Sequence, residues 1–228
     1  MSFLLTWYGH SAFLLNVDQH RILIDPYLSG NPMSPVKPDT IDADFILVSH
    51  GHGDHLGDSV AIAKRTGATV ISNAEICDWL REKGVKTHAQ HIGGGFSHPF
   101  GYLKLTTATH GSKLPDGTYG GNPAGFLLTT PYSDRLYFAG DTGLFGDMKL
   151  IGEEGLDVAI LPIGDNYTMG PGDALRAVKL LQPQMVIPIH YNTTKLIQQD
   201  VAAWAERVEM ETSAKVKVMK PGEEIAIQ

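Results

Sequence analysis

The chain of 228 residues has little of several features that would define other protein classes. It has one cysteine, Cys77, so no internal disulfide can form, and we expect a cytoplasmic protein. No apolar run approaches the ~18 residues that a membrane span needs, and the N-terminal stretch lacks the basic residues of a signal peptide. Linker-like and low-complexity segments are also absent, so we predict one domain over residues 1–228.

Positive charge is scarce as well. The chain has 18 Lys and Arg against 25 Asp and Glu, a formal net charge of -7. A broad nucleic-acid-binding surface needs the opposite sign, so we expect no nucleic acid and no membrane as partners, but a small-molecule substrate. The sequence leaves the oligomeric state open and allows a homo-oligomer. What the chain does have is 25 glycines and 10 histidines, and the histidines are clustered.

The order of the predicted elements repeats. Closely spaced apolar runs predict strands over residues 3–8, 12–17 and 21–24, an irregular loop over 30–38, and a strand buried on both faces over 45–48. Ser72 and Glu75 resemble a capping box ahead of a helix. The second half predicts strands and helices over residues 102–109, 125–130, 135–139, 158–161, 173–181 and 185–189, then a helix capped by Asp200 and a closing edge strand over 215–218. Strands followed by strand–helix units, twice, predict an α/β (α+β) protein, a four-layer αββα sandwich.

The most informative segment is His50-Gly51-His52-Gly53-Asp54-His55, directly after the predicted buried strand. Three imidazoles and a carboxylate within six residues are ligands that suit Zn, Fe or Mn. We interpret the two glycines as removing side chains from between the ligands so that the backbone can turn tightly.

Three later residues occupy equivalent positions, each following a predicted strand: His110, Asp141 and His190. Side chains collected at strand ends form a rigid cup where sheets of this type bind ligands. Seven ligands are more than one tetrahedral ion can use, so we predict two divalent ions, with zinc favoured and manganese or iron as alternatives.

This set of residues, in this order, resembles the metallo-β-lactamase superfamily of dinuclear hydrolases. Further motifs resemble a short, largely uncharacterised branch of metal-dependent hydrolases akin to the ascorbate-6-phosphate lactonase group. These motifs are Gly9-His10-Ser11-Ala12, Gly140-Asp141-Thr142-Gly143-Leu144-Phe145, Leu161-Pro162-Ile163-Gly164-Asp165, Thr168-Met169-Gly170-Pro171 and His190-Tyr191-Asn192-Thr193.

The resemblance implies a metallo-β-lactamase-like fold and a division of the ligands. It places His50, His52 and His110 on one ion, Asp54, His55 and His190 on the other, and Asp141 as a bridge between them. Many of the β-lactamases that named the superfamily carry a cysteine at the bridging position. Because Asp141 stands there and Cys77 lies in a predicted helix, we do not expect antibiotic hydrolysis.

Four other residues are weaker candidates. Asp25 ends a predicted strand and is suited to accept the second N–H of a ligating histidine. His10 lies in a Gly-His-Ser turn and could contact substrate or donate a proton, whereas Thr168 and Tyr191 would form the wall of a substrate pocket. The remaining histidines, at positions 20, 88, 91 and 98, fit no ligand spacing, and we interpret them as surface or loop residues.

The predicted function is hydrolysis of a small ester, lactone or phosphodiester by a dinuclear metal-bound hydroxide. Asp54 would orient the nucleophile as well as ligate, and His10 would protonate the leaving group. Two alternatives stay open at this point: a diiron redox or dioxygenase-type protein on the same fold, and a non-catalytic metal-binding module. His52 speaks against the reductase type, whose members tend to have a carboxylate at this position.

Overall fold

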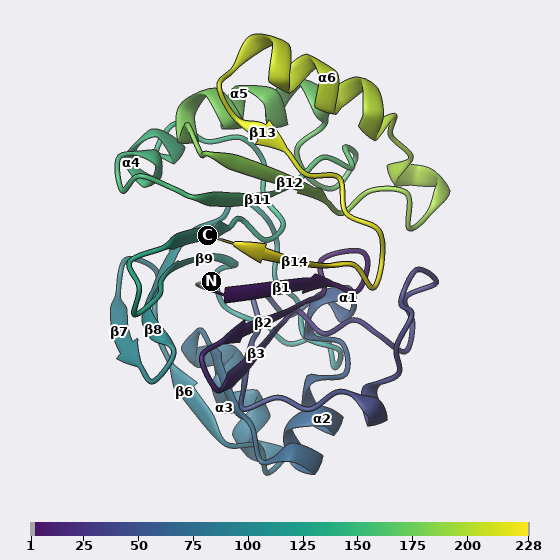
Figure 1. The fold of residues 1–228 in the computed structure, drawn as a ribbon. Coiled ribbons are helices and arrows are strands. Elements are labelled where there is room, and N and C mark those ends of the chain that lie inside the picture. The colour runs from purple at the N-terminus through teal and green to yellow at the C-terminus, as the bar shows by residue number, and fades with distance from the viewer. Residues whose placement is uncertain (1–2, 228) are drawn as a thin grey trace.

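The computed structural model describes residues 3–227, so Met1, Ser2 and Gln228 lie outside it. Two seven-stranded mixed sheets pack face to face (Figure 1). The first sheet has the order β14-β1-β2-β3-β4-β5-β6. Its strands are β1 (Phe3–Trp7), β2 (Phe13–Val17), β3 (His20–Ile24), β4 (Phe45–Leu47), β5 (Thr69–Ser72), β6 (Thr87–Ala89) and β14 (Glu224–Ile227).

The second sheet has the order β13-β12-β11-β10-β9-β8-β7. Its strands are β7 (Gly95–His98), β8 (Gly101–Thr107), β9 (Ala124–Thr129), β10 (Arg135–Phe138), β11 (Val158–Pro162), β12 (Met185–Ile189) and β13 (Lys215–Val216). In both sheets antiparallel neighbours give way to parallel ones, at β3 in the first and at β10 in the second. The predicted repetition of element order is therefore confirmed.

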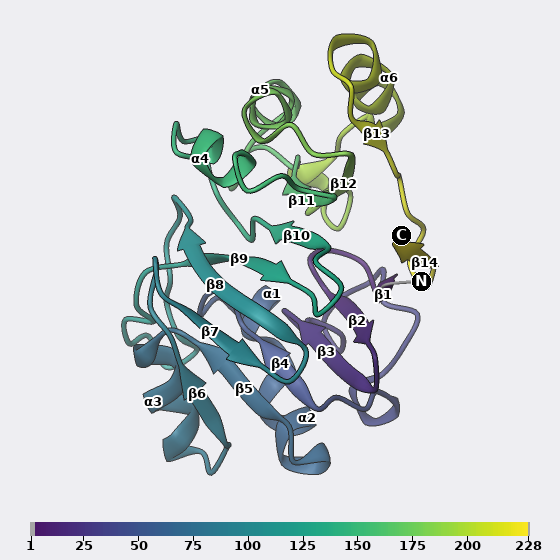
Figure 2. The same ribbon diagram turned by 60° about the vertical axis from the view of Figure 1, so that its left-hand side comes forward.

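Helices form the outer layers (Figure 2). α2 (Ser59–Thr66) and α3 (Ala74–Glu82) cover the first sheet, and α4 (Met148–Gly152), α5 (Pro171–Leu181) and α6 (Val201–Glu211) cover the second. The short elements α1 (Gly53–Leu56), η1 (Pro38–Thr40) and η2 (Lys195–Ile197) lie in the connections. None of the helices within residues 3–227 combines the length and apolar character needed to cross a membrane.

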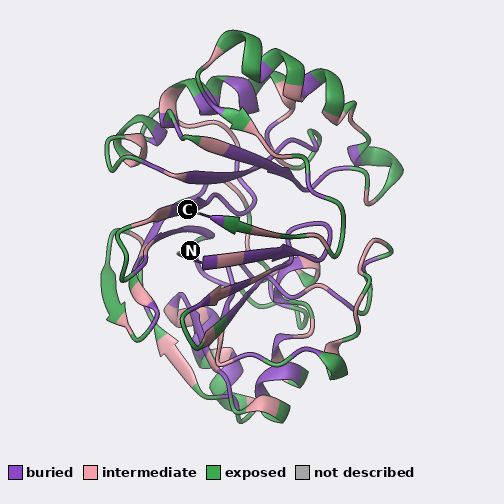
Figure 3. Cartoon of the chain, viewed as in Figure 1, coloured by how far each residue is buried: buried purple, intermediate pink, exposed green. Residues whose placement is uncertain are grey.

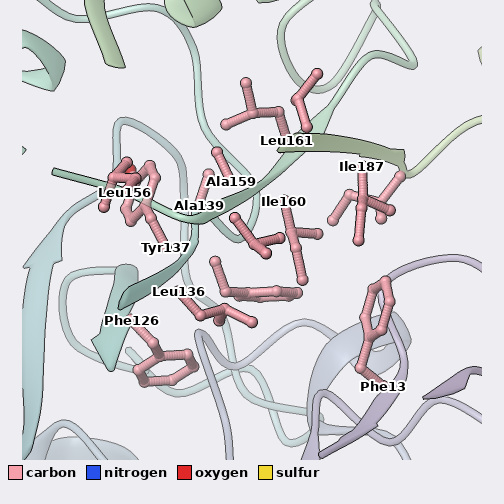
Figure 4. Packing of buried hydrophobic residues seen from close by; sticks show 14 of the residues in the cluster. Phe13, Phe126, Leu136, Tyr137, Ala139, Leu156, Ala159, Ile160, Leu161 and Ile187 are labelled. Atoms are coloured by element: carbon pink, nitrogen blue, oxygen red, sulfur yellow. The ribbon is translucent and has the colours of Figure 1, made fainter. Parts of the chain in front are cut away.

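Most strand residues near the middle of the sandwich are buried (Figure 3), and those of both sheets belong to one hydrophobic cluster. Phe13 of β2 meets Phe138 of β10 edge to face, with ring centroids 6.3 Å apart, so the two sheets are held by direct aromatic contact. Figure 4 shows Phe13 in the same core as Tyr137 and Ile160 of the second sheet. A second cluster, which includes Ile62 of α2, fills the space between the first sheet and its helices.

The structure corrects three local predictions. Asn73, not Ser72, caps α3, since its side chain accepts a hydrogen bond from Ile76 N at 2.9 Å. The Ser72 hydroxyl instead donates to Val48 O at 2.7 Å, which ties β5 to the end of β4. The strand at Lys215–Val216 is an edge strand, as expected, but it is not the closing one, because the chain returns to the first sheet and pairs β14 with β1. The histidines at 20, 88 and 98, expected on the surface or in loops, lie on strands and are partly exposed.

Candidate metal centre

The first group of expected ligands follows β4. His50 and His52 precede α1, and Leu56 N donates to His52 O at 2.9 Å, so the helix begins inside the motif. Its single turn carries Asp54 and His55. The change from extended to helical backbone lets four residues so near in sequence direct their side chains to one point.

Only one of the two glycines in this motif is required by a close approach. A Cβ at residue 51 would lie 3.2 Å from the Leu114 side chain and 3.2 Å from the Lys113 backbone, whereas nothing lies within 4 Å of a Cβ at Gly53. Gly51 therefore lets residues 113–114 pack against the ligand segment, and Gly53 has no such role.

The other three expected ligands come from the second sheet. His110 lies three residues beyond β8, Asp141 three residues beyond β10, and His190 directly after β12. The structure brings all seven together. Their ligand atoms form three overlapping groups, each within 4.8 Å: His50, His52 and His110; His50, His55 and Asp141; and His10, Asp54, His55 and His190. His10, which was not expected among the ligands, belongs to the third group.

Asp141 lies between these groups. Its Oδ1 is 3.2 Å from His55 Nε2, and its Oδ2 is 3.1 Å from His190 Nε2 and 3.6 Å from His110 Nε2. One carboxylate therefore presents its two oxygens to imidazoles from both sheets.

The donor atoms fit a metal ion. His55 Nε2 and Asp141 Oδ1 are buried and have no hydrogen-bond partner among residues 3–227. Buried polar atoms are almost always paired, and these two lie 3.2 Å apart without hydrogen-bond geometry, so a cation between them would satisfy both. His50 Nε2 and His52 Nδ1 are likewise only 3.0 Å apart. Imidazole and carboxylate donors suit zinc, manganese or iron.

The electrostatics agree with this interpretation. Burial alone would raise the pKa of Asp141, but the imidazoles of His55 and His190 outweigh it and hold that pKa well below its usual range. Burial lowers the pKa of His50 well below its ordinary value, so this imidazole is neutral and free to ligate. At His55 burial is outweighed by Asp141 and Asp25, which raise the pKa well above its ordinary value. The two carboxylates favour positive charge at His55, which a bound ion would supply.

Asp25 holds the other side of His55. The fully buried Asp25 carboxylate lies 2.7 Å from His55 Nδ1 through Oδ2. It also accepts from Ser49 N at 2.8 Å and from the Ser49 hydroxyl at 2.6 Å. With Asp25 on Nδ1, the Nε2 atom of His55 is directed toward Asp141. This is the arrangement in which a carboxylate fixes the tautomer and orientation of a ligating imidazole.

His10 joins the two sheets at the site. Its carbonyl accepts from His190 N at 3.2 Å and from Trp7 Nε1 at 3.1 Å. Its ring lies between Asp54 Oδ2, 3.3 Å from Nε2, and the Thr193 hydroxyl, 2.8 Å from Nδ1. Burial lowers the pKa of His10 to about 4, although Asp54 opposes the shift, so the imidazole is neutral at pH 7.

A cavity of about 220 Å³ opens onto these residues. It is lined by His52, Asp54, His110, Asp141, Tyr167 and His190. A larger hollow of about 340 Å³ lies beside α5 and α6, but the described residues that line it include no histidine and only one carboxylate, Glu211. Chemistry, not size, identifies the site.

The cavity wall differs from the one expected. Tyr191 is 4% exposed and stacks on Trp7 at a ring-centroid distance of 6.0 Å, and the Thr168 hydroxyl donates to Met169 O. Neither belongs to the cavity lining, whereas Tyr167, which the sequence reasoning missed, does. Its position one residue from Thr168, in a glycine-rich stretch between two ligands, was the only available signal.

Cys77 lies apart from this chemistry. It is buried in α3, and burial raises the pKa of its thiol to about 11, so it remains a thiol at neutral pH.

Comparisons with known proteins agree with the geometry. A family model described as "Beta-lactamase superfamily domain" matches residues 20–191. A UPF0173 metal-dependent hydrolase of Desulforamulus reducens is 52% identical over 234 residues, covering 98% of this chain and 99% of that protein. The structure of Igni18, described as a novel metallo hydrolase from Ignicoccus hospitalis, superposes with a TM-score of 0.91 at 40% identity, over 99% of this chain and 98% of that one.

A more distant likeness shows the fold alone. CmlA, a diiron β-hydroxylase from Streptomyces venezuelae, has a TM-score of 0.76 at 12% identity, over 98% of this chain and 54% of that chain. The narrower resemblance to the ascorbate-6-phosphate lactonase group stays a prediction. The motif order, the sandwich and the relatives agree: the chain belongs to the metallo-β-lactamase superfamily, in the group of the UPF0173 metal-dependent hydrolases.

Proposed function

We propose that this protein uses two divalent metal ions, preferably zinc, to hydrolyse a small ester, lactone or phosphodiester. The observation that carries the proposal is the position of Asp141, whose two oxygens face different imidazoles. A carboxylate so placed can bridge two ions. The relatives named metal-dependent hydrolases support the type of reaction.

The ligands divide between the two proposed ions as the family resemblance implies. His50, His52 and His110 would hold one ion, and Asp54, His55 and His190 the other, with Asp141 shared. When bound, the ions would supply a nucleophilic water at neutral pH and polarise the bond to be cleaved.

Asp54 is proposed to orient the attacking water and to accept its proton. Its carboxylate is half-buried and lines the cavity. Burial would raise the pKa of Asp54, but the neighbouring imidazoles of His10 and His55 lower it well below its usual range. The group is therefore an ionised acceptor across the neutral pH range.

His10 is proposed to carry the proton onward to the leaving group. Because the imidazole is neutral at pH 7, its proton must come from within the reaction. In the tautomer with hydrogen on Nδ1, donated to Thr193, the Nε2 atom can take a proton from Asp54 Oδ2 at 3.3 Å and give it to the departing oxygen.

The test uses protein stripped of metal and reloaded with zinc, manganese or iron. Metal content is measured alongside turnover of a panel of p-nitrophenyl esters, lactones and bis(p-nitrophenyl) phosphate. We expect two ions per chain and hydrolysis of at least one class. Asp54→Ala should lower kcat by roughly 100-fold or more. His10→Gln should slow substrates with alkoxide leaving groups more than those that release p-nitrophenolate, which needs no protonation.

Four outcomes would contradict the proposal. A single fully occupied site would remove the dinuclear mechanism. Undiminished activity in Asp54→Ala would remove the role of that carboxylate. Iron-dependent oxygen uptake without hydrolysis would favour the diiron alternative, and two bound ions with no turnover of any kind would favour a non-catalytic module.

A further inference from the structure

Tyr167 differs from every other residue that lines the metal cavity. The other five are imidazoles and carboxylates, all assigned to the proposed ions. Tyr167 contributes instead a flat apolar ring and one hydroxyl group, neither of which is a ligand for zinc in this setting.

The ring of Tyr167 is largely open to solvent. The residue is 55% exposed, and within residues 3–227 its side chain makes no hydrogen bond or ring contact that would hold it. Tyr191, by contrast, is buried against Trp7, and the hydroxyl of the equally exposed Tyr132 is bonded to Asp18. Tyr167 is therefore a large aromatic side chain beside the metal cavity that can contact a bound ligand.

The backbone under Tyr167 is held firmly. Asp165 N donates to Met169 O at 3.0 Å, and Tyr167 N donates to Asp165 O at 2.5 Å, which closes a tight turn. Asp165 and Asn166 both have positive φ angles, 62° and 53°, a conformation that costs energy in residues with a side chain. Such strain persists only where surrounding contacts enforce it.

Those contacts connect the turn to two ligand segments. Met169 N donates to Thr142 O at 2.9 Å, one residue from Asp141. Gln199 Nε2 donates to Gly164 O at 2.9 Å, from the segment that follows His190. The backbone of Tyr167 is thus tied to the ligand loops, so the ring is attached at a fixed point beside the metal centre.

We propose that Tyr167 is a specificity-determining residue, whose ring contacts an apolar, planar group attached directly to the phosphoryl or carboxyl group that the metals bind. The inference rests on the proposed function and narrows its substrate class. Substrates with an aryl or unsaturated substituent next to the scissile centre are preferred over those with a small alkyl group. The ring supplies the contact, and the hydroxyl adds a hydrogen bond to a polar atom of the same substituent where one is present.

The experiment measures binding without turnover. Phenylphosphonate and methylphosphonate are stable to hydrolysis and offer the same anionic group to the metals, but only the first has a ring. Their affinities for the zinc-loaded protein are measured by calorimetry, with zinc content measured in parallel. We expect the wild-type protein to favour phenylphosphonate, and Tyr167→Ala to weaken phenylphosphonate by roughly 5-fold or more, the size of one aromatic contact. Methylphosphonate affinity and zinc content should stay unchanged.

Two variants sharpen the result. Tyr167→Phe keeps the ring and should bind phenylphosphonate like the wild type. Tyr132→Ala removes a tyrosine of similar exposure on the turn between β9 and β10, before β10 begins, and should change neither affinity.

The inference is overturned if Tyr167→Ala leaves the preference intact, if it weakens both phosphonates equally, or if it loses zinc. It is also overturned if the zinc-loaded protein hydrolyses esters but binds neither phosphonate, in which case the proposed function stands. If the protein fails to bind two ions or hydrolyses no substrate, the proposed function itself is contradicted.

Discussion

Two clusters of histidines lie at opposite ends of the sandwich, and they differ in their neighbours. In the metal cluster (the seven predicted ligands), imidazoles follow the ends of strands and face carboxylates. In the second cluster, called here the aromatic cluster, His88 and His98 pack with Phe45, Phe96 and Phe100 where β6 and β7 form the sheet edges. Phe45 begins β4, whereas the ligand motif follows its end.

In the aromatic cluster the histidine rings pack against phenylalanine rings. His98 stacks on Phe100 with an interplanar angle of 3° and ring centroids 5.1 Å apart, and its Nε2 lies 3.0 Å from Gln90 Oε1. Within residues 3–227, all groups of three or more close metal-ligating side chains consist of members of the metal cluster and His10. The residue type alone therefore does not define the chemistry. A carboxylate partner and a position beyond a strand end distinguish a ligand from a packed ring.

Among the substitutions that test the difference between the two clusters, Asp141→Asn should have the largest effect on metal binding and activity. The substitution removes the charge that the two proposed ions share, so we expect the second ion to be lost before the first and activity to fall more than 100-fold, beyond the ~10–100-fold typical of outer-sphere changes. Titration of the apoprotein with zinc, followed by kinetics, measures both. His98→Gln is the matched control in the aromatic cluster, and a comparable loss of zinc there would erase the distinction between the clusters.

Asp25→Asn should have an intermediate effect. The amide accepts hydrogen bonds from His55 Nδ1 and Ser49 less strongly than the carboxylate does. The His55 imidazole then becomes less basic and less well oriented, although it remains among the ligands. We expect zinc affinity to fall by about 10–100-fold with the stoichiometry preserved. Competition with a chelator of known affinity measures the change. If Asp25→Asn binds zinc and turns over substrate like the wild type, Asp25 does not orient His55.

The site was easier to predict than its surroundings. The first four ligands lie within six residues, from His50 to His55. His110, Asp141 and His190 each follow an apolar strand, so sequence order alone places them at strand ends. The fold class followed from the repeated order of elements.

Other features depend on contacts that are distant in sequence. Tyr167 is in no way distinguished from Thr168 until the hydrogen bond from Met169 to Thr142 places the turn over the cavity. Gly51 and Gly53 look equivalent until Leu114 packs against one of them. Likewise β14 is too short to recognise without β1 beside it.

The smallest effect concerns the pH dependence of stability in the aromatic cluster. Burial, with a smaller contribution from His88, lowers the pKa of His98 to about 4, whereas an unfolded histidine titrates near 6.5. Between these values the unfolded chain binds the extra proton and the folded chain does not, so stability is lost as the pH falls from about 6.5 to 4. His98→Phe keeps a flat ring against Phe100 but cannot titrate.

We therefore expect His98→Phe to have a slightly smaller free energy of unfolding than the wild type at pH 7, because it loses the contact with Gln90. At pH 5 the difference between the two free energies should be smaller, because only the wild type loses stability through His98 as the pH falls. Urea unfolding of both proteins at the two pH values measures the difference in the free energy of unfolding. The metal cluster is the same in both proteins, so its titration does not affect this difference. A difference of equal size at both pH values would mean that His98 is not held neutral by burial.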